Sequence, residues 1–178
     1  GPEGIGKSLV ATAFAQLLCC PESGGLDGCG QCRTCRLLAE GRHPDLIKLE
    51  PEGAFIKIAQ VREMTKTLRY PPVEAAFRVV IIEPADKLHP AAANALLKTL
   101  EEPSLRNIFI LVTNQPHALL ATIRSRAQQQ MVIEYSTGNV YSQSYFKLRY
   151  QFLPILVSRR TSECHFNAVW GRWISIDR

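Results

Sequence analysis

The chain has 178 residues, of which 46% are hydrophobic and 21% charged, and its net charge is +5. This length suits one domain with a sizeable core. No apolar run is long enough for a membrane span and no signal peptide is visible in the sequence, so we expect a cytoplasmic protein. Residues 1–130 carry 15 basic and 13 acidic side chains. The body is therefore nearly neutral, and its charge gives little support for direct nucleic-acid binding.

The first eight residues read GPEGIGKS and match the phosphate-binding pattern G-x-x-x-x-G-K-S. The glycines let successive backbone N–H groups turn toward phosphate oxygens, the lysine reaches the terminal phosphates, and the serine hydroxyl ligates Mg²⁺. Strong helix formers follow at 9–18, so the loop leads into a helix N-terminus that favours anions. We predict a nucleoside-triphosphate site rather than a chance glycine-rich turn, formed by Gly1, Gly4, Gly6, Lys7 and Ser8.

Phosphate loops of this kind normally follow a buried strand, and here the sequence starts at the loop itself without an initiator Met. We therefore expect that the first strand of the sheet is missing from the sequence as given, and that the chain is a fragment.

Four cysteines follow the first predicted helix with the spacing C-x8-C-x2-C-x2-C. Thiolates with two residues between them can point at one ion across a tight turn, which Gly28 and Gly30 permit. This pattern predicts a structural, tetrahedral Zn²⁺ module over about residues 19–36, in preference to a disulfide framework, separate buried cysteines or an iron–sulfur cluster. The expected ligands, with Cys19 as an alternative to the first, are Cys20, Cys29, Cys32 and Cys35.

The rest of the body alternates strands with helices. Periodicity and breakers predict strands at 45–50, 78–83, 107–114 and 128–134, and helices at 58–70, 91–102 and 117–123. This order implies an α/β fold with an open, mostly parallel sheet, whose ligands bind at the carboxyl ends of the strands.

The composition changes sharply near residue 131. Residues 1–130 contain 16 alanines and 5 aromatic residues, whereas residues 131–178 contain one alanine and 9 aromatic residues. We interpret 1–134 as the nucleotide-binding domain. The atypical tail at 135–178 is expected to be frameshifted or mis-called, or else a genuine basic and aromatic segment that contacts nucleic acid.

These motifs together resemble the delta-prime family of bacterial DNA polymerase III clamp-loader subunits, which are AAA+ proteins. The shared features are the phosphate loop, the inserted four-Cys module, GRHPD at 41–45, NALLKTLEEP at 94–103 and Ser125-Arg126. They cover about residues 1–134, and the gamma/tau subunits are the nearest rival. The family's helical lid and collar domains have no counterpart in 135–178.

The resemblance implies a subunit of a hetero-pentamer that contains gamma/tau and delta, uses ATP to open the sliding clamp, and places it on primed DNA. Such a chain is a component of a DNA-directed DNA polymerase holoenzyme. It is itself at most a weak ATPase, with ATP, Mg²⁺ and structural Zn²⁺ as cofactors. The alternative from a different class is a self-sufficient P-loop ATPase or kinase with a zinc module.

A departure from the AAA+ pattern follows the strand at 78–83. AAA+ ATPases place Asp-Glu there, with the first carboxylate holding Mg²⁺ through water and the second polarising the attacking water. This chain has Glu83 and Pro84. Glu83 keeps a carboxylate for the metal, but Pro84 has no acid–base group, so we expect nucleotide binding with impaired hydrolysis. A gamma/tau subunit would be expected to keep the pair, which favours delta-prime.

Two further residues match AAA+ positions. Asn114, at the end of the predicted strand at 107–114, corresponds to sensor 1, which contacts the γ-phosphate or its water; a strand-end cap is its simpler interpretation. Arg126 corresponds to the arginine of the Ser-Arg-Cys motif, with Ala127 in place of Cys. The resemblance implies that Arg126 reaches the ATP of a neighbouring subunit as a trans-acting finger. Arg124 is an alternative, and a solvated basic surface is the simplest interpretation of both.

Overall fold

The computed structural model describes residues 3–23, 28–101, 106–128 and 157–158. Its centre is a parallel sheet of three strands in the order β1-β2-β3. The strands are β1 (Leu46–Leu49), β2 (Arg78–Ile82) and β3 (Asn107–Leu111). In the register, Val80 of β2 lies opposite Ile47 and Phe109. The predicted α/β class and the parallel sheet are confirmed.

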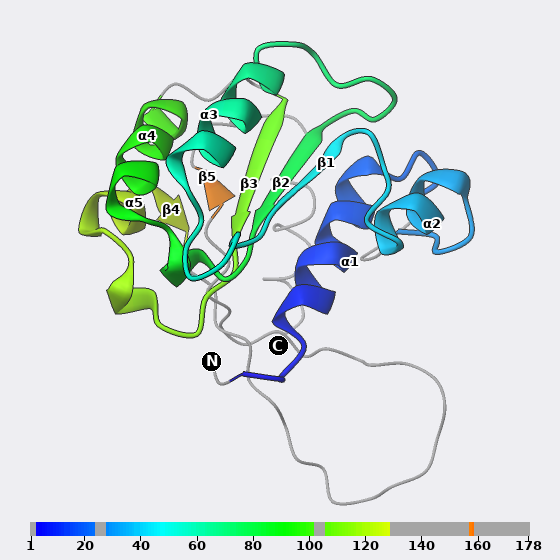
Figure 1. Cartoon of the computed structure of the whole chain (residues 1–178). Helices are drawn as coiled ribbons and strands as arrows, with labels where there is room; N and C mark the ends of the chain where they lie inside the picture. The colour runs from blue at the N-terminus through cyan, green and yellow to red at the C-terminus, as the bar shows by residue number, and fades with distance from the viewer. Residues whose placement is uncertain (1–2, 24–27, 102–105, 129–156, 159–178) are drawn as a thin grey trace, which may run out of the picture.

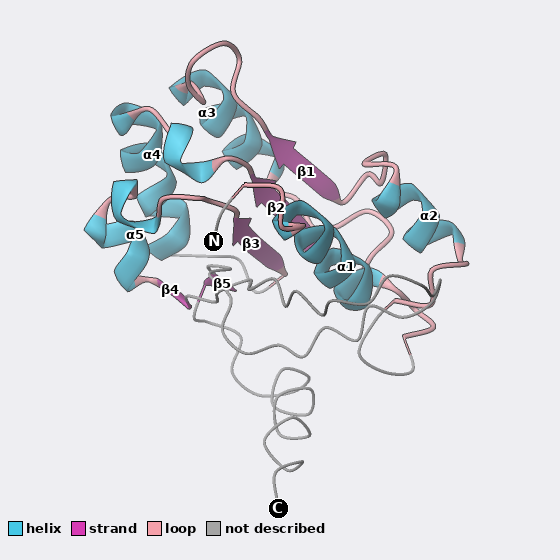
Figure 2. Cartoon of the chain, turned by 90° about the horizontal axis from the view of Figure 1, so that it is seen from below, coloured by secondary structure: helices cyan, strands magenta, loops and turns pink. Residues whose placement is uncertain are grey.

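Helices cover both faces of this sheet (Figures 1 and 2). On one face lies α1, with α2 packed beside it, and on the other lie α3, α4 and α5. The bounds are α1 (Lys7–Cys19), α2 (Arg33–Ala39), α3 (Ile58–Thr67), α4 (Pro90–Glu101) and α5 (Ala121–Ser125), with the 3₁₀ turns η1 (Ala85–Lys87) and η2 (Pro116–Ala118). None of the described helices has the length and apolarity needed to cross a bilayer.

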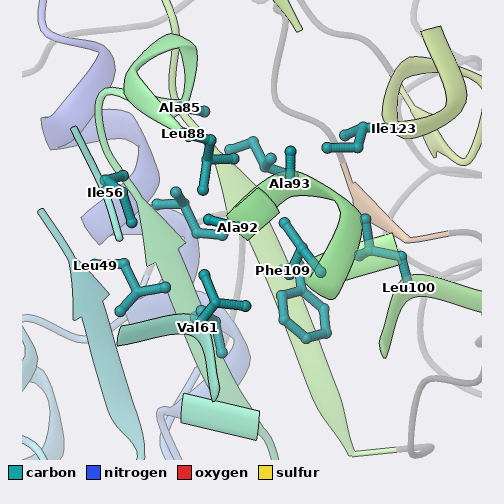
Figure 3. Close-up of a cluster of buried hydrophobic side chains, with 14 of the residues drawn as sticks. Leu49, Ile56, Val61, Ala85, Leu88, Ala92, Ala93, Leu100, Phe109 and Ile123 are labelled. Carbon is teal, nitrogen blue, oxygen red and sulfur yellow. The ribbon is translucent and has the colours of Figure 1, made fainter. Parts of the chain in front are cut away.

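The central strand β2 explains why two layers of helix form. All five of its side chains are buried, as expected for a parallel strand covered on both sides. Because successive side chains point to opposite faces, Val79 and Ile81 pack with α1, while Val80 and Ile82 pack in the cluster under α3 and α4. Figure 3 shows this second cluster, in which Phe109 of β3 lies among side chains from the helices.

A buried polar network closes the amino ends of the three strands. Asp45, directly before β1, is fully buried and accepts backbone N–H bonds from Val73, Glu74 and Ala75 at 2.7–2.9 Å. The guanidinium of Arg78 contacts the same carboxylate at 3.3 Å and donates to the carbonyls of Thr67, Tyr70 and Pro71. This network fixes the 68–77 connection against the sheet.

Several element boundaries differ from the sequence-based predictions. The expected helix at 117–123 is wrong: the chain forms η2 and then α5, separated by Leu119 in an extended conformation and by Leu120, the N-cap residue of α5. Leu119 is buried, and its insertion into the core interrupts the helical path. The expected strand at 107–114 is shorter, because only residues 107–111 pair in the sheet.

The end of the predicted domain lies only partly within the described residues. Ala127–Gln128 forms β4, which pairs antiparallel with β5 (Val157–Ser158). The remainder of the predicted strand at 128–134, the proposed boundary at 134/135 and nearly all of the tail at 135–178 lie outside the described residues.

Candidate nucleotide site and cysteine cluster

The phosphate loop enters α1 through two glycines in the left-handed region. Gly4 has φ +84° and Gly6, the N-cap residue of α1, has φ +85°. Residues with a Cβ rarely adopt this conformation. The helix begins with the Val10 N–H donating to the Gly6 carbonyl at 3.0 Å. Gly1, the first predicted glycine of the loop, lies outside the described residues.

The start of α1 lies against the carboxyl end of β2. Lys7 is only 9% exposed, and the Ser8 hydroxyl donates to a carboxylate oxygen of Glu83, the residue directly after β2. The sheet thus brings together two predicted site residues that are 75 positions apart. A small cavity beside them is lined by Ser8, Thr12, Lys48, Leu49, Glu50, Ile81 and Glu83.

A second polar contact occupies the carboxyl ends of β2 and β3. Thr113 is buried and donates its hydroxyl hydrogen to Asp86 at 2.6 Å, while its oxygen accepts the Gln115 N–H at 3.0 Å. The carboxylate of Asp86 is therefore engaged by Thr113. Asn114, the predicted sensor residue, follows Thr113 and is exposed. Sequence reasoning missed the Thr113–Asp86 pair, which no spacing pattern indicates.

Arg126 ends α5 and is tied to α4. Its Nη2 lies 2.8 Å from Glu101 Oε1, and its Nη1 donates to the Thr122 carbonyl at 3.0 Å. The side chain of Arg126 is 36% exposed and that of Glu101 49%. Helix α5 lies on the face of the sheet opposite α1, beyond α4 (Figures 1 and 2). Arg124, the alternative finger residue, is exposed.

The four predicted cysteine ligands converge. The Sγ atoms of Cys20, Cys29, Cys32 and Cys35 all lie within 4.8 Å of one another, and those of Cys20 and Cys32 are 3.9 Å apart. Tetrahedral zinc with Zn–S bonds of about 2.3 Å requires sulfur separations of roughly 3.8 Å. Backbone N–H groups of Cys29, Cys32 and Cys35 point at sulfurs of the cluster at 3.3–3.4 Å, a contact that favours thiolates. The residues fit a zinc ion.

The geometry selects Cys20 over Cys19. The Cys19 thiol points to the Phe77 carbonyl at 3.4 Å, and burial, with a smaller effect of the Asp45 charge, raises its pKa to about 12. Burial also acts to raise the pKa of Cys20, but hydrogen bonds, chiefly from the Cys29 N–H, lower it to about 7. Cys19 therefore stays a buried thiol of the core, and Cys20 joins the cluster.

The cluster is fastened to the last turns of α1. The Gln16 side-chain amide donates to the Cys35 carbonyl at 2.8 Å. At Gly28, an added Cβ would lie 2.9 Å from both Gln16 Cβ and Cys35 Sγ, so this close approach requires glycine. Arg33 also pairs with Glu74 at 3.0 Å. Neither Gln16 nor the helix α2 that carries Cys35 was predicted, because only the cysteine spacing was informative in this region.

Comparison with known proteins identifies relatives for this body. A protein of Pseudomonas aeruginosa named DNA polymerase III subunit delta' is 44% identical over 132 residues, which are 73% of this chain and 40% of the relative. A DNA polymerase III subunit tau/gamma of Haemophilus influenzae is 36% identical over 129 residues, 72% of this chain and 19% of the relative.

A solved structure of a Thermotoga maritima DNA polymerase III gamma subunit-related protein is 34% identical, with a TM-score of 0.46 over 51% of this chain and 32% of that one. The chain spans about 40% of the length of the delta' relatives that it matches. The family model described as "DNA polymerase III, delta subunit" matches residues 1–135. With the parallel sheet, the glycine loop and the cysteine cluster in place, the chain belongs to this DNA polymerase III subunit family.

Proposed function

We propose that this chain supplies the nucleotide-binding part of a delta-prime-type clamp-loader subunit, which helps ATP-driven loading of the sliding clamp onto primed DNA during replication. The observation that carries the proposal is the 44% identity to a delta' subunit over a body whose phosphate loop meets Glu83 at the strand ends. Its partners are then the other loader subunits, gamma/tau and delta, and the clamp.

The proposed nucleotide site uses the loop for the phosphates. Backbone N–H groups between Gly4 and Ser8 face the phosphate oxygens, and Lys7 neutralises their charge. Ser8 and Glu83 offer a hydroxyl and a carboxylate, the hard oxygen ligands that Mg²⁺ takes, and would hold the ion that neutralises charge between the β- and γ-phosphates when it is bound. The contact between these side chains supports this assignment.

Weak hydrolysis is the second part of the proposal. Pro84 replaces the carboxylate that polarises water in active AAA+ sites, and the nearby Asp86 is bonded to Thr113. General-base assistance typically contributes 10²–10⁴-fold, so its loss leaves a site that binds ATP and turns it over slowly. Asn114, exposed beside Thr113, is proposed to contact the γ-phosphate.

Arg126 is proposed to act on a neighbour's ATP. It is the C-cap residue of α5, a helix that lies on the opposite face of the sheet from α1 (Figure 1), as a residue that faces another subunit should. A guanidinium matches the charge that develops on a transferring phosphoryl group. The four cysteines are proposed to hold a structural Zn²⁺, which is closed to substrate because it has four protein ligands.

A catalytically active tau/gamma-type subunit is the second candidate, and the 36% identity to a tau/gamma protein favours it. The two candidates differ in what Arg126 and the chain's own site contribute to turnover. An active subunit hydrolyses ATP at its own loop, whereas the delta-prime type contributes mainly through Arg126.

The loader assay tests the proposal. Because the chain spans only part of its relatives, we would place residues 1–135 into the Pseudomonas aeruginosa delta' relative in place of the matching segment, a protein called the chimera below. The chimera is combined with the other loader subunits of that organism. Arg126→Ala should leave assembly intact and lower ATP turnover at the adjacent site by about 10³-fold.

The matched control is Arg42→Ala, since Arg42 is an exposed arginine that also pairs with a glutamate, at 3.3 Å. This variant should behave as the unmodified chimera. A loader with Arg126→Ala that hydrolyses ATP and loads clamps at the normal rate would show that Arg126 is only a surface charge. A chimera that never joins the other subunits would contradict the assignment to the loader.

A further inference from the structure

The guanidinium of Arg126 is held at two points by two different helices. Glu101 Oε1, on the last residue of α4, lies 2.8 Å from Nη2, and the Thr122 carbonyl of α5 accepts from Nη1 at 3.0 Å. The first distance is typical of a charge-assisted hydrogen bond. These bonds use two of the five N–H donors of the guanidinium, so phosphate oxygens can be contacted without breaking either.

We propose that Glu101 is a positioning residue for Arg126, which fixes the guanidinium so that its remaining donors face the triphosphate of the adjacent subunit. The inference rests on the proposed trans-acting role of Arg126 and adds a second residue to it. A long arginine side chain loses conformational freedom when it binds a ligand. Holding the guanidinium in advance removes part of this cost from the reacting complex.

The backbone on both sides of the contact is anchored in one core cluster. Leu100, next to Glu101, is 6% exposed, and Ile123, between Thr122 and Arg126, is fully buried. Both belong to the cluster in Figure 3, where they extend from α4 and α5 toward the same group of side chains. Glu101 and Thr122 therefore lie on helices that are packed into the same core. Their two acceptor oxygens together define one position for the Arg126 guanidinium.

Geometry, rather than charge, is the contribution expected from Glu101. The pair is partly exposed, at 36% and 49%, so water screens the attraction between the charges. A glutamine at this position keeps the acceptor oxygen and the side-chain length while it removes the charge. If Glu101 positions Arg126, the rate at the adjacent site should depend on the acceptor oxygen at residue 101 and only weakly on its charge.

The test uses the assembled loader with the chimera. The phosphate-loop lysines of the other ATPase subunits are replaced by alanine, except in the neighbour that faces Arg126. The measured ATP hydrolysis then comes from that one site. Glu101→Ala should lower kcat at that site about tenfold, within the roughly 10²-fold that a 1 Å misplacement can cost. The KM for ATP should stay unchanged, and Glu101→Gln should restore most of the rate.

Glu40→Ala is the matched control, because Glu40 is a carboxylate of similar exposure that pairs with Arg42 at 3.3 Å on another helix end. It should leave kcat unchanged. Arginine side-chain NMR of the chimera gives a second measurement: rotation about the Arg126 Cζ–N bonds should be slow in the unmodified protein and in Glu101→Gln, and fast in Glu101→Ala.

The outcomes separate the two proposals. If Arg126→Ala lowers the rate but Glu101→Ala does not, the positioning role is wrong and the finger role stands. If Arg126→Ala has no effect, the finger role is wrong and this inference is overturned with it. A faster rate in Glu101→Ala would mean that Glu101 restrains Arg126 from its target, the opposite of positioning.

Discussion

Asp45 shows how one side chain fixes a long connection. Burial alone acts to raise the pKa of its carboxyl, but the N–H groups of Ala75, Glu74 and Val73, with the charge of Arg78, together hold that pKa below its ordinary value. A carboxyl whose pKa is lowered on folding stabilises the fold above its unfolded pKa of about 3.9. This stabilisation is lost as the pH falls through the lower folded value.

Asp45→Asn should therefore lower the free energy of unfolding by about 3–5 kcal/mol, the usual cost of leaving one member of a buried ion pair alone. The amide also turns an NH₂ group toward backbone N–H donors. Urea unfolding of the chain at pH 7 measures the change. Glu52→Gln, which removes an exposed partner of Lys57, should change the value by at most about 1 kcal/mol.

The pH dependence gives an independent check. Between neutral pH and about pH 5, the difference between the unmodified chain and Asp45→Asn should stay constant. It should shrink below about pH 5, because the carboxyl of the unfolded chain takes up a proton near its pKa of about 3.9, and the loss should be complete once the folded Asp45, whose pKa is lower, is protonated as well. A variant that is as stable as the unmodified chain at pH 7 would contradict the structural role of this network.

Individual site residues were predictable where a motif fixes their spacing. Lys7, Ser8 and Glu83 were named from the sequence, and the structure brings Ser8 and Glu83 into contact. Glu101 was not named as a site residue, because its contact with Arg126 joins residues 25 positions apart through the packing of two helices. No local pattern encodes such a distance.

At the scale of elements, the cysteine cluster joins two helices. Cys20 follows the end of α1, Cys32 is the N-cap of α2 with its Sγ accepting the Cys35 N–H, and Cys35 lies inside α2. A metal bound here would hold the ends of both helices together. Gly28 is the point where this arrangement tolerates no side chain.

Gly28→Ala should weaken zinc binding. Its Cβ would lie 2.9 Å from both Gln16 Cβ and Cys35 Sγ, so one of the two must move, and displacing a ligand or its support typically costs 10–100-fold in metal affinity. Chelator competition on the chimera measures the affinity. Gln31→Ala, an exposed change in the same module, should have no effect.

Retention of full zinc affinity by Gly28→Ala would contradict the tight packing at this position. If the unmodified protein, purified with zinc present, contains no metal, the zinc assignment itself is wrong.

The sequence predicted these elements unevenly. Long runs with one period, such as the buried strand at 78–82 and the alanine-rich helix at 90–101, were placed within one or two residues. The helix expected at 117–123 failed because burial of Leu119 outweighed local helix preference. Helix α2 has only seven residues, too few to show a clear period.

At the scale of the whole molecule, the two ends of the sheet have different roles. The amino ends are sealed by Asp45, Arg78 and Asn107, whose amide donates to the Leu68 carbonyl at 3.0 Å. At the carboxyl ends, Glu83 contacts Ser8 at the start of α1, and Asn114 is exposed two residues beyond Val112. The amino edge is thus closed by a buried polar network, and the carboxyl edge is where the proposed nucleotide site lies, as is usual for ligands of open parallel sheets.

Helix α1 links the proposed nucleotide site to the cysteine cluster. Its first residues, Lys7 and Ser8, belong to the loop, its middle packs on β2 through Val10 and Ala11, and the Gln16 side chain donates to the Cys35 carbonyl in the cluster.

The parallel order of the sheet and its α/β class could be predicted from the alternation of strands and helices in the sequence. The attachment of the cluster to α1 did not, because it depends on side-chain packing between helices.

This arrangement predicts ATP binding with little turnover by the chimera alone. Lys7→Ala should abolish ATP binding measured by calorimetry, because the loop then lacks the charge that faces the terminal phosphates. Lys98→Ala, which changes an exposed lysine on α4, should bind ATP as the unmodified protein does.

Hydrolysis by the unmodified chimera should be at least about 10²-fold slower than that of an active tau/gamma subunit, since Pro84 supplies no general base. Turnover equal to that of tau/gamma, abolished by Lys7→Ala, would show that another carboxylate replaces the missing one and would favour the active-subunit candidate.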